Sequence, residues 1–209
     1  DYNKEQEITR DYSGREILEL LQNANDAAAE VDIKGKVLIE LHPNILIVAN
    51  TGEPFSSGGI SSLIFSHISP KKRKRKKLIG QKGLGFRAAL NWTTKPIIIS
   101  GSLSLAYSHS KKEEVFEKLK KSSSQLRRLV EREQESASEV LVPTLPFPSF
   151  IGENSIGFQK SDENISNAIP LLTSIKGNGY DTVIGLPFEE QRYYEEAKQQ
   201  VLTLIFSQR

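Results

Sequence analysis

Apolar residues recur at helical spacing near the start of the chain, where Leu18, Leu21 and Ala24 can share one face of a helix. The pattern predicts a helix that packs against a core. Ser13 is followed three residues later by Glu16, which is the spacing of a capping box, and we expect Ser13 to be the N-cap.

A polar stripe follows the same spacing, because Glu19, Asn23 and Asp26 also recur along this predicted helix. Asn and Asp are mediocre helix formers, since their side chains compete for the backbone, so the stripe needs a reason beyond helix stability. Glu19 lies one turn before Asn23, and both side chains project toward the same space. An amide oxygen can bind Mg²⁺, and a nearby carboxylate can deprotonate a water. A solvated helix face explains the stripe equally well.

The rest of the chain alternates between helical and strand patterns. Helices are expected over residues 13–31, 56–68, 111–134 and 189–206, and strands over 36–41, 45–50, 95–100, 102–108 and 179–188. A Gly-rich loop running into a helix is expected over 78–92, and an extended segment with three prolines over 142–150. This order predicts an α+β fold with a mixed, mostly antiparallel sheet.

Composition describes an ordinary globular protein of 209 residues, with 37% hydrophobic and 26% charged residues. The chain contains no Cys, which excludes disulfides and thiolate metal sites and fits a reducing compartment, so we expect a cytoplasmic protein. We expect no membrane span and no secretory leader. The chain lacks Met and starts at Asp1, so we expect it to be a piece of a longer protein.

Charge is distributed unevenly, although the net charge is only +2. Residues 71–77, with the sequence KKRKRKK, form a run of seven bases. Like charges repel and keep such a segment solvated, which suits a lid over a polyanion. A nucleic-acid patch is the rival interpretation, and it is the less favoured one.

Two polar residues end or begin strands where a ligand could reach them. Asn50 follows the run ILIVA and precedes a Gly-containing turn, so its side-chain oxygen could accept a hydrogen bond from an adenine amino group. A plain turn accounts for Asn-Thr-Gly as well. Thr182 opens a late strand and could place a hydroxyl at a pocket wall, although Thr is also an ordinary strand residue.

The segment GQKGLGF at residues 80–86 has the composition of a phosphate-binding loop. Glycines let backbone N–H groups approach a ligand closely, and a following helix offers its N-terminus to anions. The spacing is neither that of a P-loop nor that of a dinucleotide-binding fingerprint. Lys82 would add positive charge beside the phosphates, whereas a flexible connector remains the alternative.

Taken in order, the E-x-x-x-N-x-x-D helix, the hairpin ending in NTGEPF, GQKGLGF and the late DTV strand resemble the GHKL ATPases. This superfamily includes DNA gyrase, the ninety-kilodalton heat-shock chaperones, histidine kinases and MutL proteins. The sequence IGQKGLGFRAAL is most similar to the chaperone branch, and ELLQNANDA with NTGEPF to its sacsin-like relatives. The resemblance covers roughly residues 13–108 and 179–206. It implies a two-layer Bergerat-type sandwich with helices on one face and a mobile lid.

The resemblance also assigns roles. Glu19 matches the general base that activates the hydrolytic water, and Asn23 matches the magnesium ligand, which also reaches the phosphates. Asp26 matches a pocket residue near the adenine or ribose. Asn50 stands where the family usually places an Asp that accepts from the adenine amino group, so this chain would make that bond without charge assistance.

The remaining matches concern the turn, the loop and the late strand. Gly52 matches a turn glycine, and Thr182 matches the late-strand Thr near adenine. Pro54 stands where the chaperones have another glycine. Residues 56–79 would form the lid. The phosphate-binding loop is matched by Gly80, Gln81, Lys82, Gly83, Leu84, Gly85 and Phe86.

The resemblance thus implies a single ATP-binding domain over residues 1–209, with an unassigned helical insertion at about 111–175. We expect ATP and Mg²⁺ as ligands, Mg²⁺-dependent ATP hydrolysis, and a chaperone-like role as the nucleotide switch of a larger protein. An ATP-dependent homodimer and further domains of the same chain are the implied partners. One alternative is a histidine kinase catalytic domain. Another is a nucleic-acid-binding module that uses 71–77 and has a degenerate nucleotide pocket.

Overall fold

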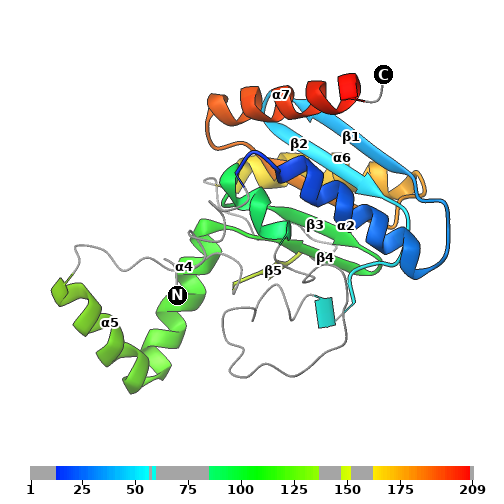
Figure 1. Cartoon of the computed structure of the whole chain (residues 1–209). Coiled ribbons are helices and arrows are strands. Elements are labelled where there is room, and N and C mark those ends of the chain that lie inside the picture. Colours follow the sequence, from blue (N-terminus) through cyan, green and yellow to red (C-terminus); the bar gives the residue numbers. More distant parts are fainter. Residues whose placement is uncertain (1–12, 57, 60–84, 137–146, 152–161, 208–209) are drawn as a thin grey trace, which may run out of the picture.

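The computed structural model describes residues 13–56, 58–59, 85–136, 147–151 and 162–207. Its described part is built on a six-stranded sheet in the order β1-β2-β6-β3-β4-β5 (Figure 1). The strands are β1 (Val37–His42), β2 (Ile45–Asn50), β3 (Ile97–Ser100), β4 (Leu103–Ala106), β5 (Ser149–Phe150) and β6 (Thr182–Pro187). Every neighbouring pair is antiparallel, which confirms the predicted α+β fold.

Two hairpins and one distant strand make up most of the sheet. β1 pairs with β2, and β3 pairs with β4 across Gly101, which has a φ of +58° and so favours glycine. β6, from the far end of the chain, pairs with both β2 and β3. The inner strand thereby joins the hairpins and brings three strand ends, at Asn50, Ser100 and Thr182, side by side.

One face of the sheet is covered by α2 (Glu16–Glu30), the 3₁₀ helix η1 (Gly85–Asn91) and α7 (Gln191–Ser207) (Figure 1). Their buried residues form one core with alternate residues of the central strands: Ile17, Leu20, Leu46, Val48, Phe86, Ala89, Trp92, Ile98, Ile184, Leu186 and Ala197. Leu18, which we expected to face a core, is 49% exposed, because Ile17 and Leu20 occupy that side of α2. The expected α-helix after the Gly-rich segment is the 3₁₀ helix η1.

The start of α2 also differs from the prediction. The helix begins at Glu16 after Arg15, whose side chain makes no capping hydrogen bond, and the Ile17 N–H in the first turn donates to Gln200 Oε1 on α7 at 3.1 Å. The buried Glu16 carboxylate instead accepts hydrogen bonds from Gly14 N at 3.2 Å, Asn91 Nδ2 at 2.7 Å and Gln200 Nε2 at 2.5 Å. The capping-box interpretation was wrong because Glu16 links α2 to η1 and α7 rather than to the backbone of Ser13.

The opposite face of the sheet is covered by α6 (Glu163–Gly177), a helix that the sequence analysis left unassigned. Its apolar residues pack on the other alternate positions of the strands, in a second core of Ile45, Ile47, Ala49, Ile97, Ile99, Ala106, Ile165, Ala168, Ile169, Leu172, Ile175 and Val183. Pro170 lies inside this helix and weakens its sequence pattern. The α+β sandwich is as predicted, but the expectation of two layers with helices on one face is corrected: α2, η1 and α7 cover one face, and α6 covers the other as a third layer.

The helices α4 (His109–Ser122) and α5 (Ser124–Ser136) extend away from the sheet as a pair (Figure 1). They confirm the predicted helical stretch with a Ser-rich break, which falls at Ser123. Hydrogen bonds from Lys118 and Lys111 hold the pKa of the exposed Glu114 carboxyl below its ordinary value. Ion pairs of this kind on a solvated face add little stability.

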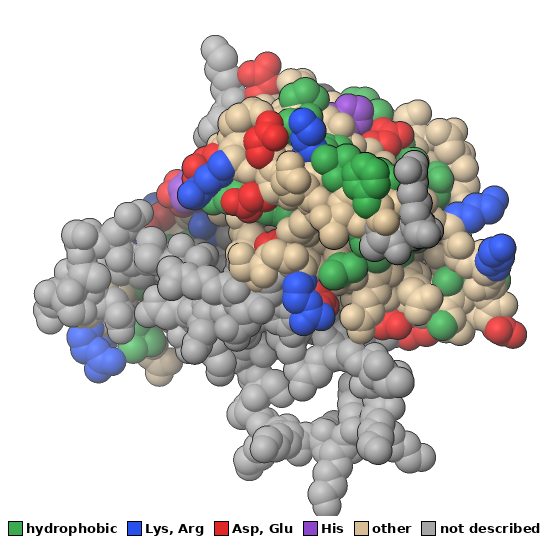
Figure 2. Space-filling model, turned by 45° about the horizontal axis from the view of Figure 1, so that its top comes forward, with side chains coloured by type: hydrophobic (Ala, Val, Ile, Leu, Met, Phe, Trp, Pro, Cys, Tyr) green, Lys and Arg blue, Asp and Glu red, His purple; other side chains and the backbone are tan. Residues whose placement is uncertain are grey.

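Two further predictions fall largely outside the described residues. Of the helix expected over 56–68, residues 56 and 58–59 are described; 58–59 are helical and Ser56 is not. Of the extended segment expected over 142–150, the described end includes β5, which pairs with β4. No helix in the described ranges combines the length and apolar character needed to cross a membrane. The face that carries α7 shows acidic, basic and apolar side chains intermixed (Figure 2).

Candidate functional site

A row of buried polar side chains crosses the end of the sheet. Asn50 on β2 pairs with Thr182 on β6, and Thr182 pairs with Ser100 on β3. Their exposed fractions are 6%, 3% and 1% respectively. The residues two positions away on the same strands, Val48, Ile184 and Ile98, belong to the core beneath α2 and η1. Since side chains alternate between the faces of a strand, the polar row lies on that same face.

A cavity of about 250 Å³ lies between α2 and the end of this sheet face. Ligand pockets commonly measure about 300–1,000 Å³, so its size suits part of a nucleotide-sized molecule. Five residues that the sequence analysis selected from separate stretches line it: Asn23, Asp26, Asn50, Phe86 and Thr182. Its other described lining residues are Leu20, Ala27, Glu30, Val48, Glu53, Pro54, Phe55, Ser56, Gly59 and Ile184.

The cavity combines apolar walls with a polar end. Leu20, Val48, Ile184 and Phe86 come from both the helices and the sheet, and all belong to the core cluster or pack within it. Such walls suit a flat aromatic ring, while a few polar groups fix its orientation. The polar end is supplied by Asn50, the last residue of β2, and Thr182, the first residue of β6, which are directly paired and both line the cavity.

Asn50 is held in one orientation by its own chain. Its Nδ2 donates to Thr51 O at 3.2 Å, and its backbone carbonyl accepts from Asp181 N at 2.9 Å. Among the described residues, no donor is found for its Oδ1 atom. The amide therefore offers an acceptor to a ligand in the cavity.

The turn after β2 is hydrogen-bonded to α2 and to Asp181, the residue before β6. Gly52 has a φ of +129°, and a Cβ there would lie 2.5 Å from the Ala27 carbonyl carbon, so only glycine fits. Gly52 N donates to Asp181 Oδ2 at 2.9 Å, and Glu53 N donates to Ala27 O at 2.8 Å. These bonds set the position of the cavity wall that follows, from Glu53 to Ser56.

Two residues that sequence reasoning missed support this arrangement. Asp181 precedes Thr182 and anchors the Gly52 turn. Ser100 Oγ accepts from Phe55 N at 2.9 Å and lies 2.6 Å from Thr182 Oγ1. The only sequence signal for Asp181 was its place in the DTV motif, and Ser100 had none, because its partners come from distant strands.

Glu19 lies on α2 beside the cavity residues but is not among the described residues that line it. It is 8% exposed, and its Oε1 atom pairs with Arg15 Nη2 at 3.2 Å. Asn23, one turn later, does line the cavity. The predicted polar stripe is therefore divided: Glu19 at its start forms an ion pair, whereas Asn23 and Asp26 line the cavity.

The candidate phosphate-binding loop lies mostly outside the described residues, which begin again at Gly85. Gly80, Gln81, Lys82, Gly83 and Leu84 are not described. Gly85 opens η1, and Phe86 is 1% exposed and lines the cavity. Phe86 therefore shares the cavity with Asn23 and Asp26 of α2, and the placement of the glycines and Lys82 of the loop stays a prediction.

The charge of the described lining is negative. Asp26, Glu30 and Glu53 contribute carboxylates, and no Lys or Arg is among the described lining residues. No group of three His, Cys, Asp or Glu side chains suited to a metal occurs in the described part of the chain. Mg²⁺ usually keeps several waters and takes one or two protein ligands plus phosphate oxygens, and the Asn23 amide is compatible with that mode.

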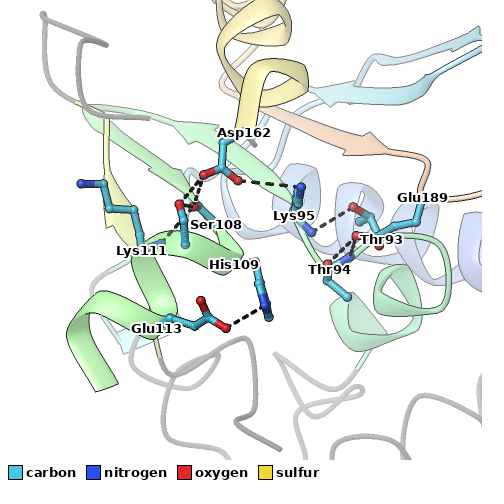
Figure 3. A network of polar contacts seen from close by, with 10 residues as sticks. Thr93, Thr94, Lys95, Ser108, His109, Lys111, Glu113, Asp162 and Glu189 are labelled. Atoms are coloured by element: carbon cyan, nitrogen blue, oxygen red, sulfur yellow. Dashed lines mark hydrogen bonds and ion pairs between the residues drawn. The ribbon is translucent and has the colours of Figure 1, made fainter. Parts of the chain in front are cut away.

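A second polar cluster lies away from this cavity, where β3, α4 and α6 begin (Figure 3). The fully buried Asp162 accepts from Ser108 Oγ at 2.7 Å and from Ser110 Oγ at 2.5 Å. Its other oxygen, Oδ1, lies 3.8 Å from Lys95 Nζ. Ser108 also caps α4 by accepting from Lys111 N. The cluster fixes the start of the projecting α4 to the sheet and to α6.

Comparison with known proteins gives this chain no family, because no family model matches it and no curated protein matches it either.

Proposed function

We propose that this chain binds ATP with Mg²⁺ in the cavity between α2 and the sheet, and hydrolyses it as a GHKL-type ATPase domain that acts as the nucleotide switch of a larger protein. The observation that carries the proposal is the shared cavity of Asn23, Asp26, Asn50 and Thr182. These residues come from three separate stretches of the sequence, and the resemblance to the GHKL ATPases implies that all four belong to one nucleotide site.

The base is proposed to lie at the polar end of the cavity. Leu20, Val48 and Phe86 offer apolar surface to the faces of a purine. The acceptor on Asn50 suits the exocyclic amino group of adenine, and the Thr182 hydroxyl adds a second polar contact on the neighbouring strand. The hydrogen bond from the amino group to Asn50 is neutral, and it is therefore weaker than one to a carboxylate.

The phosphates are proposed to extend past Asn23 toward η1. The acidic lining at Asp26, Glu30 and Glu53 repels a polyanion, so phosphate binding requires cations. Mg²⁺ would neutralise phosphate charge there, with Asn23 as its protein ligand. Lys82 and the glycines of residues 80–85 are the proposed phosphate contacts, and Lys82 would supply the basic side chain that the described lining lacks.

For hydrolysis we assign Glu19 as the general base. Its carboxylate would accept a proton from a water that attacks the terminal phosphorus, and the bond to the ADP oxygen then breaks. Glu19 is held by Arg15, whose side chain is 61% exposed. Because the Arg15 side chain is exposed while Glu19 is buried, the guanidinium can move into solvent and leave the carboxylate to the water.

The decisive experiment is a calorimetric titration with a non-hydrolysable ATP analogue, with and without Mg²⁺. We expect binding that depends on Mg²⁺, and its loss or strong weakening in Asn23→Ala. Asn25→Ala is the matched control, because Asn25 lies on the same helix but is exposed and does not line the cavity. Absence of binding by the unaltered chain contradicts the proposal.

Turnover separates the alternatives raised by the sequence. With γ-labelled ATP, free phosphate supports an ATPase, whereas label retained on protein supports a histidine kinase. Nucleic-acid affinity that falls steeply with salt, together with no ATP binding, supports the module based on residues 71–77.

A further inference from the structure

The hydroxyl groups of Ser100 and Thr182 form a buried pair at the polar end of the cavity. Their oxygens lie 2.6 Å apart, and the residues are 1% and 3% exposed. Thr182 lines the cavity, whereas Ser100 lies behind it on β3. Ser100 Oγ is also 2.9 Å from Phe55 N, and Phe55 belongs to the cavity wall.

The direction of this hydrogen bond follows from counting hydrogens. A backbone N–H can only donate, so Ser100 Oγ accepts from Phe55. Ser100 has one hydroxyl hydrogen, and its partner among the described residues is Thr182 Oγ1. If Thr182 were the donor, the Ser100 hydrogen would be buried without an acceptor, which costs free energy. Ser100 is therefore the donor, and the Thr182 hydrogen is left for the cavity.

We infer that Ser100 is a positioning residue that sets Thr182 as a hydrogen-bond donor toward the bound ligand. The inference rests on the proposed function and deepens it. Asn50 and Thr182 are directly paired on adjacent strands, so the cavity presents an acceptor beside a donor. A ligand edge with a donor beside an acceptor is complementary to this arrangement.

This polarity selects between purine classes. A 6-aminopurine presents an amino donor next to an unprotonated ring nitrogen, which matches Asn50 and Thr182. A 6-oxopurine presents a carbonyl next to a ring N–H, which is the reverse arrangement. The chain should therefore prefer the 6-amino base, and the preference should depend on Ser100 although Ser100 does not touch the ligand.

The test compares non-hydrolysable analogues of ATP and ITP, which differ at the 6-position, by calorimetry in the presence of Mg²⁺. We expect the unaltered chain to prefer the 6-amino analogue by about tenfold or more. In Ser100→Ala the Thr182 hydroxyl is free to rotate, so affinity for the 6-amino analogue should fall about fivefold while that for the 6-oxo analogue is unchanged or rises. Ser102→Ala, an exposed change on the same hairpin, is the matched control and should leave both unchanged.

A merely structural role for Ser100 would weaken both analogues by the same factor, and that result overturns the inference. Thr182→Val adds a second check: once the hydroxyl is gone, Ser100→Ala should cause no further loss of preference. If Ser100→Ala does not fold, Ser100→Cys keeps a side chain of similar size with a weak donor and should lower the preference in the same direction.

Amide exchange separates failure of the inference from failure of the proposed function. Exchange of the Phe55 amide should speed up in Ser100→Ala and stay slow in Thr182→Val, since only the first removes its acceptor. If the unaltered chain binds neither analogue, the proposed function fails whatever the exchange shows. If it binds both with equal affinity, or Phe55 exchange is unchanged in Ser100→Ala, ATP binding can stand but the role of Ser100 is refuted.

Discussion

Asn50 and Thr182 occupy directly paired positions on β2 and β6, and both side chains line one cavity. β6 lies between the two hairpins of the sheet, so residues far apart in the sequence share its end. The pairing places the polar side chains of these two strand residues next to each other, and the cavity walls beside them are apolar. The first prediction concerns the acceptor in this pair.

Changing Asn50 tests whether its oxygen contacts the ligand. Asn50→Ala removes the acceptor, and affinity for the 6-amino analogue should fall about five- to tenfold, which corresponds to one hydrogen bond. Asn50→Asp offers a charged acceptor, and charge-assisted bonds are about twice as strong as neutral ones, so affinity should rise. Calorimetry measures both. Unchanged affinity in Asn50→Ala would exclude this contact.

Glu19 is the residue whose removal should separate binding from turnover. Glu19→Gln keeps the size of the side chain and removes the base, so phosphate release should fall by about 10²-fold or more. Nucleotide affinity should change little, because Glu19 is not among the described residues that line the cavity. Phosphate release and calorimetry on the same preparation test both statements. Turnover at the original rate would remove the assigned base.

The framework of the fold could be predicted from the sequence because most of it is local. The hairpins at Val37–Asn50 and Ile97–Ala106, and the helices α2 and α7, follow from hydrophobic spacing and turn residues a few positions apart. α6 was missed for two reasons. Pro170 interrupts its helical pattern, and its apolar residues pack on the second face of the sheet, away from α2 and α7.

The site could be predicted only in part, for a similar reason. Asn23, Asp26, Asn50 and Thr182 were chosen from local motifs, and the cavity brings them together. Ser100 could not be chosen, because its role depends on the register of β3 against β6, which is a non-local property. Glu16 was assigned to a local capping box, whereas its partners Asn91 and Gln200 come from other helices.

Gly52 should be intolerant of a side chain. In Gly52→Ala the Cβ would lie 2.5 Å from the Ala27 carbonyl carbon at a φ of +129°, so the turn must leave α2. We expect the free energy of unfolding to fall by about 1–3 kcal/mol from backbone strain alone. Gly177→Ala is the control, because a Cβ there meets nothing within 4 Å at the end of α6. It should be neutral or stabilise by up to about 1 kcal/mol, as measured by denaturant unfolding.

Asp162 should be essential to the attachment of α4, independently of any ligand. Asp162→Ala leaves the hydroxyls of Ser108 and Ser110 and the nearby Lys95 without their carboxylate (Figure 3). We expect the free energy of unfolding to fall by about 3–5 kcal/mol, since two hydrogen bonds to a charged group, each contributing about 1.5–3 kcal/mol, are lost.

Glu113→Ala is the comparison for Asp162→Ala, because it removes an exposed ion pair of the same helix, between His109 and Glu113. That change should lower the free energy of unfolding by less than about 1 kcal/mol. Amide exchange should locate the Asp162→Ala effect at the start of α4 and α6, where the carboxylate joins them. Equal effects of the two changes would mean that the buried cluster does not hold α4 in place.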